Sequence, residues 1–238
     1  MQSFGEFQSA HAWSTIKVPV LVTLLHDLER AGGQLSAQQR ANATLALEQS
    51  DNAASEALFS DLEQLHGGLV AASAALQGQL RAAGDQRTII NTARNDQGFT
   101  TYGQSLWPVS GEVIFYRALA RGRLLTAQHT AFVLGLMSNV IGSQRWGAGA
   151  AGYPAATPLA FKGGWGPDSS GAHEVRQTAI VGSGARGYVV SMLARPASGS
   201  FADGTALVTA LARWARENLD AGAPPAPCRA RKQPSRAT

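Results

Sequence analysis

Apolar residues recur at helical spacing through the first 140 residues of the chain. Leu58, Leu62 and Leu65, for example, fall on one face of a single predicted helix. Ser36 and Thr126 are suitable N-caps for two others. Together, these signals predict helices over 14–30, 36–48, 53–65, 69–81, 108–121 and 126–139.

The last third of the chain changes its spacing. Short apolar or alternating segments, separated by Gly, Ser and Asp, predict antiparallel strands over 159–165, 174–181 and 188–194. An amphipathic helix over 201–219 follows, with apolar residues at Leu207, Leu211, Trp214 and Leu219. Helices therefore fill the middle of the chain and strands its end. This separation predicts an α+β fold with an inserted helical subdomain at about 33–140.

Three other segments have their own character. Residues 2–8 are expected to form a short strand. Residues 84–107 are polar and lack helical spacing, and a loop of this length inside a compact domain is usually functional. The glycine-rich segment 182–187 resembles a phosphate-binding loop, but it joins two strands rather than a strand and a helix, so we interpret it as a hairpin turn.

The charge is concentrated at the end of the chain. The net charge is +4, and four of the 20 Lys and Arg residues lie in the Pro- and Ala-rich segment 223–238. Without these four, the basic residues equal the 16 acidic ones. We therefore expect a formally neutral domain over 1–222, followed by a disordered basic tail, and we do not expect a nucleic-acid partner.

The sequence offers little for metal binding. The single cysteine, Cys228, lies in the tail, which excludes a disulfide within the domain. The five histidines show no pairing at metal-ligand spacing, so they are expected on the surface or at helix ends. No apolar segment reaches the length of a membrane-spanning helix. No metal and no cofactor are therefore expected, and the partner is expected to be a small-molecule substrate.

The first chemical motif is Ser14-Thr15-Ile16-Lys17. Residues i and i+3 share a helix face, so the Lys17 amine can approach the Ser14 hydroxyl. A serine needs a base to become a nucleophile, and a buried lysine with a lowered pKa can be that base. Taken alone, the motif more often marks a helix start with a serine cap and a solvated lysine.

Two more motifs follow in order. Ser50-Asp51-Asn52 lies in a break between predicted helices, where it also suits a plain helix cap. Lys162-Gly163-Gly164 lies at the end of the first late strand, where a turn with an exposed lysine is the alternative. The order and the predicted element of each motif resemble the penicillin-recognising serine hydrolases, the superfamily of class A β-lactamases and penicillin-binding proteins.

The resemblance implies a β-lactamase/transpeptidase-like fold and a role for each motif residue. Ser14 would be the nucleophile, Lys17 its proton acceptor and Ser50 a proton shuttle. The remaining roles concern the substrate: Asn52 would hold its amide, Lys162 would attract its carboxylate, Gly163 and Gly164 would let it approach the strand, and the Trp165 N–H would join that of Ser14 in an oxyanion hole. Arg176 would assist with the carboxylate, or is a plain surface arginine.

The sequence departs from the superfamily at several points. Gly163 replaces a hydroxyl residue that normally binds the substrate carboxylate, a loss of about 1.5–3 kcal/mol. The loop over 84–107 contains no glutamate to activate a deacylating water; its acids are Asp85 and Asp96, and Glu112 lies beyond it. The segment before Ser14 and the Ser14–Ser50 spacing are both short for the superfamily.

Two functions remain open on these grounds. One is a serine hydrolase acylated at Ser14 by a β-lactam, amide or ester, with slow deacylation. The other is a non-catalytic relative that binds peptidoglycan fragments or penicillin. No signal peptide is visible, and an exported precursor with a longer start is expected from the resemblance. Trp13 and Trp165 adjoin motifs and are candidates to line the site, whereas Trp107 and Trp146 are expected to pack internally.

Overall fold

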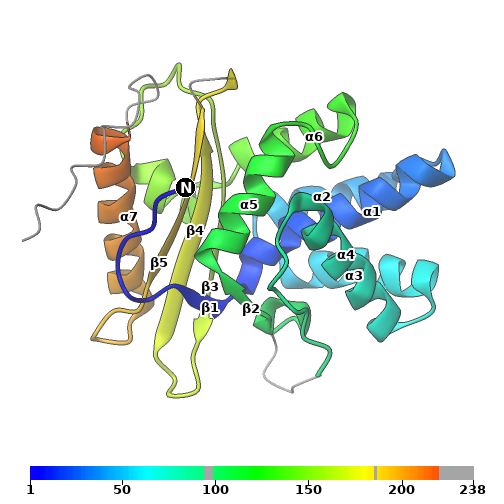
Figure 1. Ribbon diagram of the computed structural model, residues 1–238, viewed down its shortest axis with the longest axis horizontal. Helices are drawn as coiled ribbons and strands as arrows, with labels where there is room; N and C mark the ends of the chain where they lie inside the picture. Colours follow the sequence, from blue (N-terminus) through cyan, green and yellow to red (C-terminus); the bar gives the residue numbers. More distant parts are fainter. Residues whose placement is uncertain (94–98, 185–186, 220–238) are drawn as a thin grey trace, which may run out of the picture.

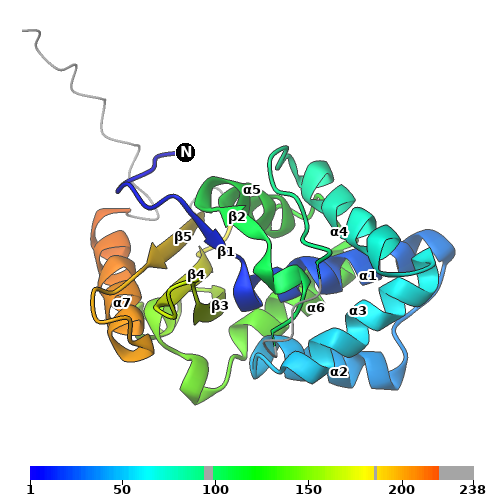
Figure 2. The ribbon, with the colours of Figure 1, turned by 90° about the horizontal axis from the view of Figure 1, so that it is seen from below.

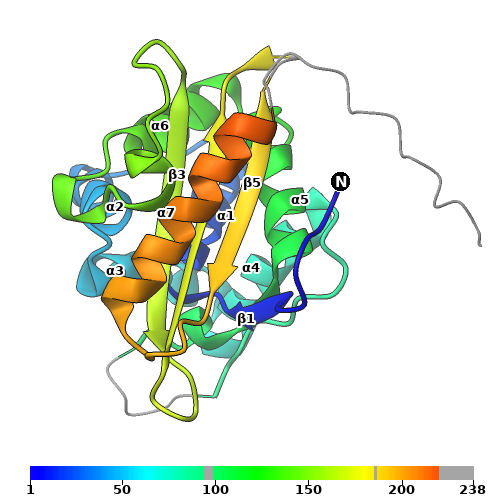
Figure 3. The same cartoon turned by 90° about the vertical axis from the view of Figure 1, so that its left-hand side faces the viewer.

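The computed structural model describes residues 1–93, 99–184 and 187–219, and it has the predicted α+β fold (Figure 1). Its main sheet contains β3 (Leu159–Pro167), β4 (His173–Val181) and β5 (Tyr188–Ala194) in antiparallel order β3-β4-β5. The three predicted strands are confirmed to within two residues at each end. Helix α7 (Phe201–Asn218) lies across one face of this sheet (Figure 3).

The other helices gather on the opposite side of the sheet (Figures 1 and 2). Helix α1 (Lys17–Ala31) runs through the middle of this group, and its first nine residues are all buried. Around it pack α2 (Ala37–Glu48), α3 (Asn52–His66), α4 (Leu69–Ala83) and α6 (Ala127–Ser138). Helix α5 (Val109–Ala120) packs against α4, α6 and the sheet. The predicted cap at Ser36 is confirmed as a capping box with Gln39, and the predicted cap at Thr126 accepts from the His129 amide.

The strand predicted over 2–8 is wrong. The first strand is β1 (Ser9–His11), which pairs antiparallel with β2 (Leu106–Pro108) in a separate two-stranded ribbon. Residues 1–6 are exposed, and Gly5 has a left-handed φ of 78°, which ends any extended run there. Pairing with a strand almost 100 residues away places β1, which leads directly to Ser14, beside β2 at the start of α5.

Four short 3₁₀ helices complete the described chain: η1 (Trp13–Ile16), η2 (Tyr102–Gln104), η3 (Gly142–Gln144) and η4 (Gly147–Ala150). The first of them replaces the opening turn of the helix that was predicted from residue 14. Ser14 thus lies in a tight turn that continues into α1, rather than in the α-helix itself.

Helix α7 packs against the sheet with a face that does not carry its largest apolar side chains. Gly204, Val208, Ala212 and Ala215 are buried against the sheet, whereas Leu207, Leu211 and Trp214 are each more than 40% exposed. Small side chains let the helix approach the sheet closely: a Cβ on Gly204 would lie 2.4 Å from Val175. Volume at the contact, and not hydrophobicity, therefore decides which face packs.

Some sequence predictions fall outside the described residues. These are the tail over 223–238 with Cys228, Asp96 of the polar loop, and part of the turn over 182–187. Within the described part of the chain, no helix is both long and apolar enough to cross a membrane.

Candidate active site

Ser14 lies where three elements meet. It follows β1, occupies η1 and precedes α1, and its side chain is half-buried. Its backbone rests against β3, because a Cβ built on Gly164 would lie 2.8 Å from the Ser14 nitrogen. The Ser14 hydroxyl makes no hydrogen bond to any described residue, so it is available to a ligand.

Lys17 is buried beneath this turn, with 1% of its surface exposed. Its Nζ donates to the Ser50 carbonyl oxygen at 2.6 Å and to Asn52 Oδ1 at 2.7 Å. Burial lowers the pKa of Lys17 to about 7, although the negative charges of Asp51 and Glu56 partly oppose this effect. At neutral pH a large fraction of Lys17 is therefore the free amine.

Ser50 connects Lys17 to a second lysine. Its hydroxyl accepts a hydrogen bond of 2.6 Å from Lys162 Nζ, while its carbonyl accepts from Lys17. Ser50 has a left-handed φ of 62°, an uncommon conformation for a residue with a side chain. The next residue, Asp51, caps α3 by accepting a hydrogen bond from the Ala54 amide. The alternative of a plain helix cap is therefore also correct for this motif, but only for Asp51.

Lys162 lies on β3 and is also buried, with 2% of its surface exposed. Besides Ser50 it donates to the Gly163 carbonyl oxygen at 3.1 Å. Burial, and next the positive charge of Lys17, hold the pKa of Lys162 well below its usual range. The alternative prediction of an exposed lysine in a turn is therefore wrong, because Lys162 is a buried residue inside a strand.

The residues of β3 alternate between two faces. Gly164 and Gly166 face η1, and a Cβ on Gly166 would lie 2.6 Å from the Trp13 ring. Gly163 faces the other way, where a Cβ would lie 2.5 Å from the Trp146 ring. Trp165, next on that face, is half-buried. The motif thus places the Lys162 amine at Ser50. Its two glycines allow close contacts on opposite faces of the strand, Gly164 with η1 and Gly163 with Trp146.

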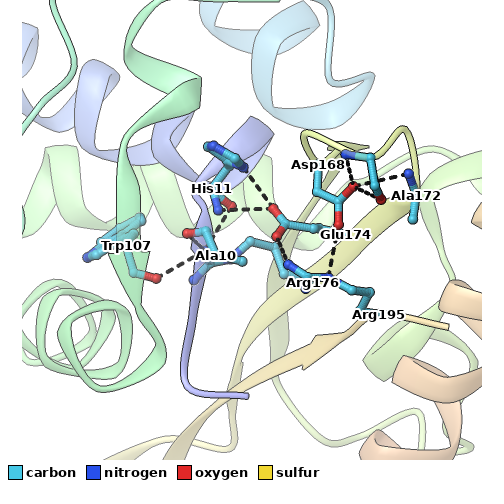
Figure 4. A network of polar contacts seen from close by, with 9 residues as sticks. Ala10, His11, Trp107, Asp168, Ala172, Glu174, Arg176 and Arg195 are labelled. Atoms are coloured by element: carbon cyan, nitrogen blue, oxygen red, sulfur yellow. Dashed lines mark hydrogen bonds and ion pairs between the residues drawn. The ribbon is translucent and has the colours of Figure 1, made fainter. Parts of the chain in front are cut away.

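Arg176 does not join these residues. It is completely buried on β4, where its Nη2 pairs with Glu112 at 2.6 Å. Its Nη1 donates to the carbonyl oxygens of Ala10, His11 and Trp107, so the guanidinium fastens β1 and β2 to the sheet (Figure 4). Neither sequence interpretation, a substrate-binding residue or a surface arginine, agrees with this position, and we leave Arg176 out of the proposed site.

The described acids of the polar loop region have structural partners. Asp85 is buried and accepts from Trp107 Nε1 at 3.0 Å and from the Thr88 hydroxyl at 2.5 Å. Glu112 holds Arg176 and also accepts from Ser191.

Two features of the site were missed in the sequence. The first is a polar network in which Glu174 accepts from His11 at 2.8 Å and from Arg195 at 2.7 Å, while Arg195 also pairs with Asp168 (Figure 4). The second is the position of Trp146 against Gly163. Both join residues far apart in the chain, and no local spacing signals either.

Comparisons with known proteins show where this fold recurs. No protein-family model matches the chain, and no curated protein matches it significantly in sequence. Among solved structures, the chromosome-encoded β-lactamase of Vibrio parahaemolyticus superposes with a TM-score of 0.69 at 14% identity, covering 90% of this chain and 86% of that one.

Two further β-lactamase structures also superpose on this chain. A β-lactamase from Xanthomonas campestris pv. campestris gives a TM-score of 0.68 at 19% identity, covering 89% of this chain and 84% of that one. A β-lactamase from Streptosporangium roseum gives 0.67 at 15% identity, covering 91% and 87%. At these identities the comparison shows the fold, which is that of the β-lactamases, as the sequence motifs predicted.

Proposed function

We propose that this protein, which has the β-lactamase/transpeptidase-like fold, is a serine hydrolase that is acylated at Ser14 by a β-lactam, amide or ester. One observation carries the proposal: Ser50 lies between two buried lysines, Lys17 and Lys162, directly beside the turn that holds Ser14. Burying two amines costs free energy, and a purely structural core would not need them.

Acylation requires a base and an acid. In the proposed reaction the neutral Lys17 amine takes the Ser14 proton as Oγ bonds to the substrate carbonyl carbon. The bond from that carbon to the leaving nitrogen or oxygen then breaks, and the leaving atom receives a proton through the Ser50 hydroxyl, which Lys162 orients. Lys17 ends this half-reaction able to pass its proton back to Ser50.

The developing oxyanion is expected to bind backbone N–H groups. The amides of Ser14 and Trp165 are the proposed donors, since Gly164 brings β3 against the Ser14 backbone. A side chain at residue 164 would separate them. This explains why a glycine is needed at a position whose backbone is otherwise an ordinary strand.

Deacylation is proposed to be slow. Two described carboxylates, Asp85 in the polar loop and Glu112 in α5, are engaged in structural hydrogen bonds. Without a base to activate water, the acyl-enzyme would persist. The lack of an identified base also supports the second candidate, a protein that binds penicillin or peptidoglycan fragments with little turnover. The hydrogen bonds of the Lys17 amine, which go to Ser50 and Asn52 rather than to Ser14, are compatible with this candidate.

Intact-protein mass spectrometry tests the proposal. The native protein is incubated with benzylpenicillin and, separately, with p-nitrophenyl butyrate, alongside Ser14→Ala and a matched surface control, Ser143→Ala. We expect an adduct on the native protein and on the control, and none on Ser14→Ala. If the native protein forms no adduct and releases no product, the acylation proposal fails and the binding alternative gains support.

A further inference from the structure

The backbone that leads into Ser14 is strained. Trp13, the residue before it, has a left-handed φ of 47°, which is costly for a residue with a large side chain. Such a conformation persists only where the surrounding structure holds it in place. One of these contacts is the Trp13 ring, because the residue is only 5% exposed and the ring lies against Gly166 of β3. The turn that carries the candidate nucleophile therefore depends on contacts from other elements.

A second contact reaches the residue after Ser14. In an α-helix the Thr15 carbonyl oxygen would accept from the amide of residue 19, but that residue is Pro19, which has no N–H. Besides the nearby Lys17 amide, the Tyr116 hydroxyl donates to this oxygen, at 2.9 Å and from a position 101 residues away in the chain. Tyr116 thus supplies a hydrogen bond in place of the one that the proline removes from the start of α1.

The backbone on both sides of Ser14 is fastened to the same two elements, β4 and α5. Arg176 of β4 donates to two carbonyl oxygens of β1, which precedes Ser14. Tyr116 of α5 donates to the carbonyl oxygen that follows it. Glu112, one helical turn before Tyr116, pairs with Arg176 and so joins the two anchors. The position of the nucleophile is therefore defined from both directions along the chain.

Tyr116 is suited to hold this oxygen but not to exchange protons. It is completely buried, and the rings of Trp107 and Phe115 lie at centroid distances of 6.3 Å and 5.7 Å from its own. Burial, and next the negative charge of Glu112, hold the pKa of Tyr116 well above its usual value, although the charge of Arg176 partly opposes this effect. The hydroxyl is therefore a permanent donor, and a buried group of this kind touches no substrate.

From the hydrogen bond between Tyr116 and Thr15, we infer that Tyr116 is a positioning residue for Ser14. It holds the turn in the geometry needed for attack, and it sets the maximal rate of acylation rather than the affinity for the substrate. This inference rests on the proposed acylation of Ser14. Small displacements of a reacting atom slow a reaction strongly, whereas the loss of a hydroxyl that touches no substrate leaves binding unchanged.

The Tyr116→Phe variant tests this role, because it removes one oxygen atom and keeps the ring. Its matched control is Tyr153→Phe, which removes a hydroxyl that bonds Tyr188, also at 2.9 Å, beside the cluster between the sheet and α7. Burst kinetics with p-nitrophenyl butyrate give the maximal rate of acylation and the half-saturating concentration. For Tyr116→Phe we expect the maximal rate to fall about tenfold at an unchanged half-saturating concentration. Tyr153→Phe should change neither value.

A second variant separates the hydrogen bond from the packing of the ring. Adding Pro19→Ala to Tyr116→Phe gives residue 19 an N–H that can donate to the Thr15 carbonyl oxygen. The double variant should therefore recover most of the lost rate. A double variant as slow as Tyr116→Phe would show that Tyr116 does not act through this oxygen.

The outcomes distinguish the inference from the function on which it rests. Urea unfolding of each variant ensures that rates are compared between folded proteins. A maximal rate of Tyr116→Phe within about twofold of the native rate, or an equal fall in Tyr153→Phe, would overturn the inference while leaving acylation at Ser14 intact. If the native protein forms no adduct with p-nitrophenyl butyrate or benzylpenicillin, the proposed function fails, and the positioning role of Tyr116 fails with it.

Discussion

Lys17 and Lys162 contact the same residue, Ser50, one through its carbonyl oxygen and the other through its hydroxyl. The two amines come from α1 and β3, and the pKa of each is lowered by burial. Two like charges this close would repel each other, so the arrangement favours neutral amines at the pH where the site works.

The rate of acylation should rise with pH through a midpoint near 7 and then level off. Lys17 acts as a base only as the free amine, and its pKa is lowered to about 7. Rates of p-nitrophenyl butyrate acylation between pH 5 and 9 check this. Lys17→Arg, which stays protonated, should reduce the plateau by about 10²–10⁴-fold. A midpoint near the ordinary lysine value would show that Lys17 is not the base.

Replacing Lys162 by methionine should stabilise the protein at pH 7 while impairing acylation. The pKa of Lys162 is lowered on folding, so the unfolded chain binds one more proton than the native protein between the folded and unfolded pKa values. The buried Lys162 therefore lowers the free energy of unfolding at pH 7, and this loss shrinks as the pH rises toward 10. We expect Lys162→Met to gain about 1–2 kcal/mol in urea unfolding at pH 7. The gain should shrink at pH 9.5, and a stability loss at pH 7 would contradict the argument.

Adding one methyl group at residue 164 should be costly for activity. A Cβ on Gly164 would lie 2.8 Å from the Ser14 nitrogen and 3.0 Å from the Thr15 nitrogen, so η1 must move. We expect Gly164→Ala to slow acylation by about 10²-fold, because small displacements of a nucleophile have effects of this size. Gly135→Ala is the matched control. A Cβ there meets nothing within 4 Å in α6, so acylation should be unchanged and stability should rise by about 0.5–1 kcal/mol.

Arg176 should matter for folding rather than for substrate. Arg176→Met leaves Glu112 buried without its partner and frees the carbonyls of β1 and β2, so we expect a loss of about 3–5 kcal/mol in the free energy of unfolding. The double variant Arg176→Met/Glu112→Gln should lose clearly less than the two single variants combined. Additive losses in this double-mutant cycle would argue against a coupled pair.

Local signals in the sequence predicted most of the elements. The Ser36 capping box, the Thr126 cap and the three late strands depend on neighbouring residues, and each appears where it was expected. The order of the three motifs was enough to predict the fold.

What the sequence did not predict depends on long-range contacts. The partners of Arg176 are 64 to 166 residues away in the chain, and the Trp146 ring lies against a glycine 17 residues later on a different element. The packing face of α7 was equally hidden, because the largest apolar residues of the helix are not the ones that fit the sheet. Periodicity reports which residues are apolar, but not the volume available to them.

The positions of the tryptophans make the intrinsic fluorescence of the protein sensitive to the proposed site. Trp13, Trp146 and Trp165 adjoin the motifs around Ser14, whereas Trp107 is sealed in the core and Trp214 lies on the outer face of α7. Trp13 directly precedes Ser14 and Trp165 directly follows the Lys162-Gly163-Gly164 motif, so both adjoin the proposed site. A ligand that settles there would change the polarity around their indoles, and the intrinsic emission of the unlabelled protein would report its occupancy in real time.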